Sequence, residues 1–90
     1  MSLVFILTKP PESPRAELCL RMLSGNFRLY LLGDGVYNII SGRLEGIAGE
    51  VFAFTSDLRA RGVLPAGIKE LDDYGMMVDD IMGAERVFAF

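Results

Sequence analysis

Histidine and tryptophan are absent from this chain of 90 residues, and cysteine occurs once, at position 19. Without histidine, the chain lacks the side chain best suited to proton transfer near neutral pH and the commonest protein ligand for metals. A single cysteine cannot form an internal disulfide, which fits a reducing, cytoplasmic setting. The composition therefore predicts neither a metal site nor a bound cofactor.

Runs of basic residues and long apolar runs are also missing. The net charge is −3 with scattered Lys and Arg, so direct nucleic-acid binding has no electrostatic basis. The apolar run at residues 3–7 is too short to span a membrane and follows no basic leader. In contrast, 51% of the residues are apolar, more than one small core needs. We therefore expect a single domain over residues 1–90 that makes subunit contacts, in a homo-oligomer or with other chains.

Strand-like and helix-like segments alternate along the chain. Apolar runs predict strands at residues 3–7, 27–32, 51–54, 68–71 and 86–90. Capping residues and helical periodicity predict helices at residues 14–24, 36–41, 57–61 and 74–82. This alternation is typical of an α/β domain, so we predict a single three-layer α/β/α domain around a mainly parallel five-stranded sheet.

The helices after the second and fourth strands have predicted buried faces. The first of these faces consists of Val36, Ile39 and Ile40. The second consists of Met77, Val78 and Ile81. Asp72 or Asp73 is expected to cap the last helix, and Asp79 and Asp80 are expected on its solvated side.

The turn Gly33-Asp34-Gly35 lies where the second strand ends and a helix begins. Asp34 has two interpretations: a helix cap that accepts from first-turn amides, or a polar group beside a ligand. Parallel sheets usually place their chemistry at the carboxyl ends of strands, where Asp34, Gly35, Tyr37 and Thr55 would together shape a binding site. The glycines match neither a phosphate-binding loop nor a dinucleotide-binding motif.

Cys19 is predicted to lie on the inward stripe of the first helix, with Ala16, Leu20 and Leu23. Buried free cysteines commonly pack as small hydrophobic side chains. Cys19 also lies beyond the first helical turn, where a helix N-terminus would lower its pKa. The alternative is sulfur chemistry, for which Arg15, one turn earlier, would help to form a thiolate in an open site.

Short motifs follow one another in a fixed order along nearly the whole chain. They are Lys9-Pro10-Pro11, Cys19 within Glu17-Leu18-Cys19-Leu20, Asp34-Gly35-Val36, Asp57-Leu58-Arg59-Ala60-Arg61-Gly62, Asp73-Tyr74 and Val87-Phe88-Ala89-Phe90. At this spacing the set resembles the DsrH/TusB family, the smallest of three related subunits in sulfur-relay complexes.

The resemblance implies a DsrE-like fold and a complex with DsrE/TusD-like and DsrF/TusC-like subunits, two copies of each. In that family sulfur passes as a persulfide between cysteines, either to the 2-thio group of a wobble uridine in tRNA or in dissimilatory sulfur oxidation. Cys19 matches a cysteine of DsrH-type members, which implies that it could carry sulfur. Its thiolate would then attack an incoming persulfide.

Two positions depart from the family pattern. The place of the sister subunit's acceptor cysteine is taken by Phe54 or Thr55, neither of which can hold a persulfide. Many members have a histidine in the first strand, where this chain reads Val4-Phe5-Ile6-Leu7. The chain is therefore expected to be a non-catalytic or sulfur-carrying accessory subunit rather than an independent enzyme. The alternative is a free-standing oligomeric module of the same fold that binds a small ligand near Asp34 and Thr55 without sulfur chemistry.

Overall fold

Five strands form one sheet in the computed structural model, which describes residues 2–90. The strands are β1 (Leu3–Leu7), β2 (Phe27–Leu31), β3 (Glu50–Phe54), β4 (Lys69–Leu71) and β5 (Arg86–Ala89). Their order is β4-β3-β2-β1-β5, and every neighbouring pair is parallel. The predicted five-stranded sheet is confirmed, and it is parallel throughout.

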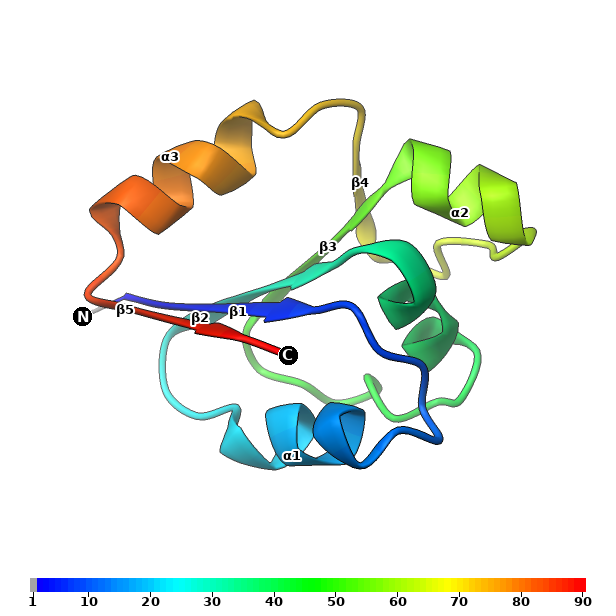
Figure 1. Ribbon diagram of the computed structural model, residues 1–90, viewed down its shortest axis with the longest axis horizontal. Coiled ribbons are helices and arrows are strands. Elements are labelled where there is room, and N and C mark those ends of the chain that lie inside the picture. Colours follow the sequence, from blue (N-terminus) through cyan, green and yellow to red (C-terminus); the bar gives the residue numbers. More distant parts are fainter. Residues whose placement is uncertain (1) are drawn as a thin grey trace.

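Helices cover both faces of this sheet (Figure 1). They are α1 (Pro14–Met22), the 3-10 helix η1 (Gly33–Ile39), α2 (Thr55–Arg61) and α3 (Gly75–Gly83). The chain steps from β1 to β4 one strand at a time and then returns through α3 to pair β5 with the other side of β1. Crossovers between parallel strands are right-handed, so this reversal of direction places α3 on the face opposite α1 and η1. The predicted three-layer α/β/α architecture is confirmed.

Alternating side chains along the strands build one core on each face. The core on the α1 side contains Phe5, Leu7, Leu29 and Leu31 with side chains from the three helices of that face. The smaller core on the α3 side consists of Val4, Tyr30, Phe52 and Phe54. Since both faces are covered, the strands read as continuous apolar runs rather than as alternating ones.

Helix α1 follows the sequence prediction closely. Ser13 is the N-cap residue and its hydroxyl accepts from the Arg15 amide at 3.3 Å. Ala16 and Cys19 are buried against the sheet, whereas Leu18 and Met22 remain 48% and 37% exposed. The predicted inward stripe is confirmed, since Leu20 and Leu23 also pack against this core.

A helix follows β2 as predicted, but it is a 3-10 helix over Gly33–Ile39 and not a helix over residues 36–41. Its N-cap residue is Leu32, without a side-chain hydrogen bond. Asp34 already lies inside the first turn, so it cannot cap the helix and forms an ion pair instead. The helix ends before Ile40, which is 67% exposed rather than buried.

The last two helices also differ from the predictions at their ends and faces. Helix α2 begins at Thr55 and has Phe54 at its N-cap. Helix α3 has Tyr74 at its N-cap, and the Asp73 carboxylate accepts from the Gly75 amide instead of capping. Val78 is 50% exposed, not buried. No helix within residues 2–90 is long and apolar enough to cross a membrane.

Candidate functional site

An ion-paired cluster lies at the carboxyl ends of β2 and β3. The Arg61 side chain at the end of α2 donates through Nε to Asp34 Oδ1 at 2.9 Å. Its Nη1 also lies 3.5 Å from Asp57 Oδ1. The hydrogen bond to Asp34 raises the pKa of Arg61. The guanidinium and the Asp34 carboxylate therefore neutralise each other, and Arg61 is a member of this site that the sequence analysis did not single out.

The other predicted site residues lie at the same edge of the sheet but have separate partners. Thr55 Oγ1 donates to Asp72 Oδ1 at 3.2 Å, and within the described residues 2–90 no hydrogen bond joins Thr55 to Asp34. The side chain of Tyr37 is half-buried and packs on the α1-side core. The ligand-binding role of this edge thus stays a prediction, and its polar groups are engaged with one another.

Gly35 is the point of closest approach between η1 and β1. A Cβ atom built on Gly35 would lie 2.0 Å from the Leu7 carbonyl oxygen. That oxygen also accepts from the Leu32 amide at 3.0 Å. Only glycine fits here, so Gly35 shapes the strand end through its lack of a side chain.

Asn38 is a buried polar residue in this region that sequence reasoning missed. Its Nδ2 donates to the carbonyl oxygens of Lys9 and Gly35 at 3.0 and 2.9 Å. Its Oδ1 has no hydrogen-bond partner among the described residues. The signal in the sequence was an amide between apolar neighbours in the stretch from Val36 to Ile40. The hydrogen bond from Asn38 to the Lys9 carbonyl oxygen holds η1 against the segment that follows β1.

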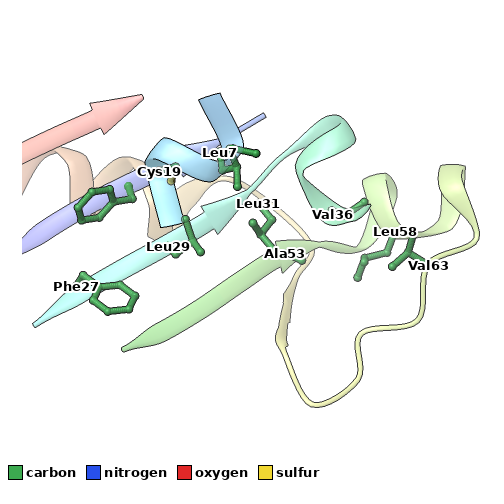
Figure 2. Close-up of a cluster of buried hydrophobic side chains, with 11 residues drawn as sticks. Leu7, Cys19, Phe27, Leu29, Leu31, Val36, Ala53, Leu58 and Val63 are labelled. Carbon is green, nitrogen blue, oxygen red and sulfur yellow. The ribbon is translucent and has the colours of Figure 1, made fainter. Parts of the chain in front are cut away.

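Cys19 is fully buried in the α1-side core, where Figure 2 shows it above the sheet with Leu7 and Leu29. Burial raises the pKa of its thiol to about 11. Arg15 turns away toward the C-terminus, with Nη2 3.5 Å from the Ala89 carbonyl oxygen and the guanidinium over the Phe90 ring. The structure therefore keeps Cys19 protonated near neutral pH and provides no cation from Arg15 to form its thiolate.

A second polar cluster lies on the α3 side of the sheet. Arg28 and Tyr30 alternate on β2 and therefore point to the same face. The Tyr30 hydroxyl donates to Asp80 Oδ2, and Arg28 Nη1 donates to Asp80 Oδ1 at 2.5 Å. Asp80 was predicted to be solvated, and that prediction is wrong because these two donors draw it to the sheet. The alternation of polar residues at positions 28 and 30 was the available signal.

The electrostatics of this cluster fix Asp80 as a carboxylate. Burial raises the pKa of Asp80, but the hydrogen bonds from Arg28 and Tyr30 outweigh it and lower the pKa overall. Burial, followed by the bond to Asp80, raises the pKa of Tyr30. We call Arg28, Tyr30 and Asp80 the α3 clamp, because together they hold the helix to β2.

Further ion pairs connect the α3 clamp to the neighbouring strands β3 and β4. Arg28 Nε lies 3.6 Å from Glu50 Oε1, and Lys69 Nζ lies 3.0 Å from Glu50 Oε2. A pocket of roughly 600 Å³ at the amino ends of β1, β2 and β3 is lined by Arg28, Glu50 and Asp80 among others. Within residues 2–90, no group of three or more His, Cys, Asp or Glu side chains is placed to hold a metal ion.

These features define a small three-layer α/β domain with a parallel sheet, one buried thiol and polar clusters at both ends of its strands. The family model for "DsrH like protein" matches residues 8–87. The chain therefore belongs to the DsrH-like family, and this membership indicates in general terms a sulfur-relay subunit.

A solved structure shows the same fold. It is the solution NMR structure of protein Tm0979 from Thermotoga maritima, with a TM-score of 0.61 and 23% sequence identity. The match covers 92% of this chain and 93% of that one. A search of curated proteins gave no match.

Proposed function

We propose that this protein is an accessory subunit of a sulfur-relay complex, assembled with DsrE/TusD-like and DsrF/TusC-like chains. The observation that carries the proposal is the family match over residues 8–87. The exposed apolar side chains of Val78 and Met82 on α3 support an assembly, because contact with another chain would remove them from water.

The chemical step of such a relay is thiol exchange. A thiolate attacks the outer sulfur of a donor persulfide, the sulfur–sulfur bond breaks, and the donor cysteine leaves as a thiolate. The atoms and electrons balance without an oxidant. In the proposed complex this step takes place between cysteines of the partner chains, and sulfur is delivered either to a tRNA uridine or to a sulfur-oxidation enzyme.

Cys19 has two roles open to it within this proposal, carrying sulfur or packing the core. Its full burial and its raised pKa favour the packing role, because attack on a persulfide needs an accessible thiolate. Carrying sulfur would require α1 to move away from the sheet. We therefore propose that the subunit supports the relay as a structural component.

Native mass spectrometry of the tagged protein, purified gently from its own cells, tests the assembly. We expect a complex of defined ratio in which the two other chains are identified as DsrE-like and DsrF-like. A monomer or homo-oligomer without these chains would refute the proposal and favour the small-ligand-binding module.

A Cys19→Ala variant in the reconstituted complex tests the role of the thiol. We expect sulfur transfer at the parent rate, with assembly of the complex measured on the same samples as a control. Loss of transfer from a complex that still assembles would instead establish Cys19 as a carrier.

A further inference from the structure

One flank of α3 carries an exposed apolar stripe formed by Val78 and Met82. These two residues are four positions apart, so they lie on the same side of the helix. They are 50% and 82% exposed. Tyr74, at the N-cap of α3, instead packs on Phe54 with 4.5 Å between the ring centroids. Met77 and Ile81 face the α3-side core instead. The α3 stripe is therefore apolar surface beyond what the helix uses to pack on its own sheet.

The face of the sheet beneath α3 is also incompletely covered. Five strands spaced about 4.8 Å apart make a sheet about 20 Å wide, whereas one helix is about 10 Å across. Figure 1 shows α3 as the helix that spans this face, opposite α1. Val87 on the edge strand β5 is in register with Val4 of the α3-side core and is 41% exposed. This face thus leaves room for another chain beside α3.

The charge around α3 indicates the chemistry of that chain. Residues 72–85 contain five of the twelve acidic residues and none of the nine basic ones. This segment carries a charge of −5, and the rest of the chain carries +2. Asp79 is exposed beside the α3 stripe, and no ion pair joins it to another described residue. An apolar stripe bordered by the unpaired carboxylate of Asp79, within an acidic segment, is complementary to an apolar surface bordered by Lys or Arg.

The same charges argue against a second copy of this chain on the α3 stripe. Asp79 lies at the middle of α3, which spans Gly75–Gly83. Twofold pairing of α3 with its copy would bring two Asp79 carboxylates together, and like charges in contact oppose association. A different chain with a basic border meets no such repulsion.

We propose that the α3 stripe, together with Asp79, is the docking surface for a sister subunit of the relay that presents an apolar hollow bordered by basic side chains. This inference rests on the proposed function, because it names the surface through which that complex forms. The α3 clamp holds the helix in place before binding, so little conformational freedom is lost on docking.

The test compares two matched pairs of substitutions in the chain co-expressed with its sister subunits. Val78→Ser with Met82→Ser alters the α3 stripe. Leu18→Ser with Met22→Ser alters an exposed pair on α1 with the same four-residue spacing. We expect the α3 pair to weaken assembly roughly tenfold or more and the α1 pair to leave it unchanged, as native mass spectrometry over a dilution series would measure.

A charge reversal, Asp79→Lys, separates the electrostatic part of the proposal from the apolar part. We expect weaker assembly at low salt and a smaller difference from the parent at high salt, because screening removes the contribution of exposed charges. Asp79 is exposed, so this variant keeps the fold and stays informative if the serine pair does not.

The outcomes distinguish this inference from the function on which it rests. If the parent chain forms no complex with sister subunits, both fail. If the parent assembles while the α3 variants assemble equally well, or the α1 pair is weakened as much as the α3 pair, the docking surface is wrong and the relay function stands.

Discussion

Removing the Tyr30 hydroxyl tests whether the α3 clamp holds α3 to the sheet. In Tyr30→Phe the ring stays, and with it the stacking on Phe52 at 5.0 Å between ring centroids. Only the hydrogen bond to the Asp80 carboxylate is lost. Hydrogen bonds to charged groups contribute about 1.5–3 kcal/mol, and Asp80 keeps Arg28 as a donor. We therefore expect the free energy of unfolding to fall by about 1–2 kcal/mol.

Thermal unfolding followed by circular dichroism measures this loss. For a domain of this size, 1 kcal/mol corresponds to about 4–8 °C, so the melting temperature should fall by roughly 4–16 °C. Tyr37→Phe is the matched control, because no hydrogen bond from the Tyr37 hydroxyl is present in the described structure, and we expect a change within about 0.5 kcal/mol.

Amide hydrogen exchange identifies which part of the structure loses stability in Tyr30→Phe. Helix α3 contains no fully buried residue, so few apolar contacts protect it against local opening. We expect the amides of α3 to exchange faster in Tyr30→Phe while those of β2 stay protected. Equal melting temperatures for Tyr30→Phe and Tyr37→Phe, with unchanged exchange in α3, would refute the reasoning about the clamp.

Three further predictions concern other parts of the structure. Gly35→Ala places a Cβ 2.0 Å from the Leu7 carbonyl oxygen. We expect the free energy of unfolding, measured in urea, to fall by about 3 kcal/mol or more. Gly83→Ala is the control and should be tolerated, because its Cβ meets nothing within 4 Å. The Cys19 thiol should react with a disulfide reagent roughly a hundredfold more slowly in the folded protein than in urea, because burial hides it and raises its pKa; equal rates would contradict its burial. The pKa of Asp80 is lower in the folded protein than its ordinary value of about 4. The ionised Asp80 side chain therefore stabilises the fold fully above that ordinary pKa, and this stabilisation is lost as the pH falls through the pKa of the folded state. The melting temperature should accordingly drop less on acidification in Tyr30→Phe than in the parent.

The sequence was most informative where one physical signal dominates. Continuous apolar runs and the Ser13-Pro14 helix start identified the strands and α1, because burial and capping act locally. Alternation of strands and helices then implied a parallel sheet with both faces covered. The resemblance to the DsrH/TusB family, drawn from motif order, is confirmed by the family match over residues 8–87.

The polar clusters were harder to predict because they depend on contacts between distant segments. Asp80 and Tyr30 are 50 residues apart in the sequence, and only the return of α3 over the sheet brings them together. Asp34 was interpreted from its local sequence as a helix cap or as a polar group beside a ligand, whereas its partner Arg61 lies on the next crossover. The rotation of α3 that exposes Val78 follows from the same long-range clamp.

The position of β5 has a consequence for the order of folding. Pairing of β1 with β2 closes a segment of 24 residues, from Leu3 to Phe27, whereas pairing of β1 with β5 closes 83 residues, from Leu3 to Arg86. The longer closure costs roughly 1 kcal/mol more in chain entropy. We therefore expect β1 to β4 to assemble first and β5 to be added last, with α3. Until then the apolar strand β1, which is an interior strand of the finished sheet, is an open edge, and the folding chain is vulnerable to aggregation at that stage.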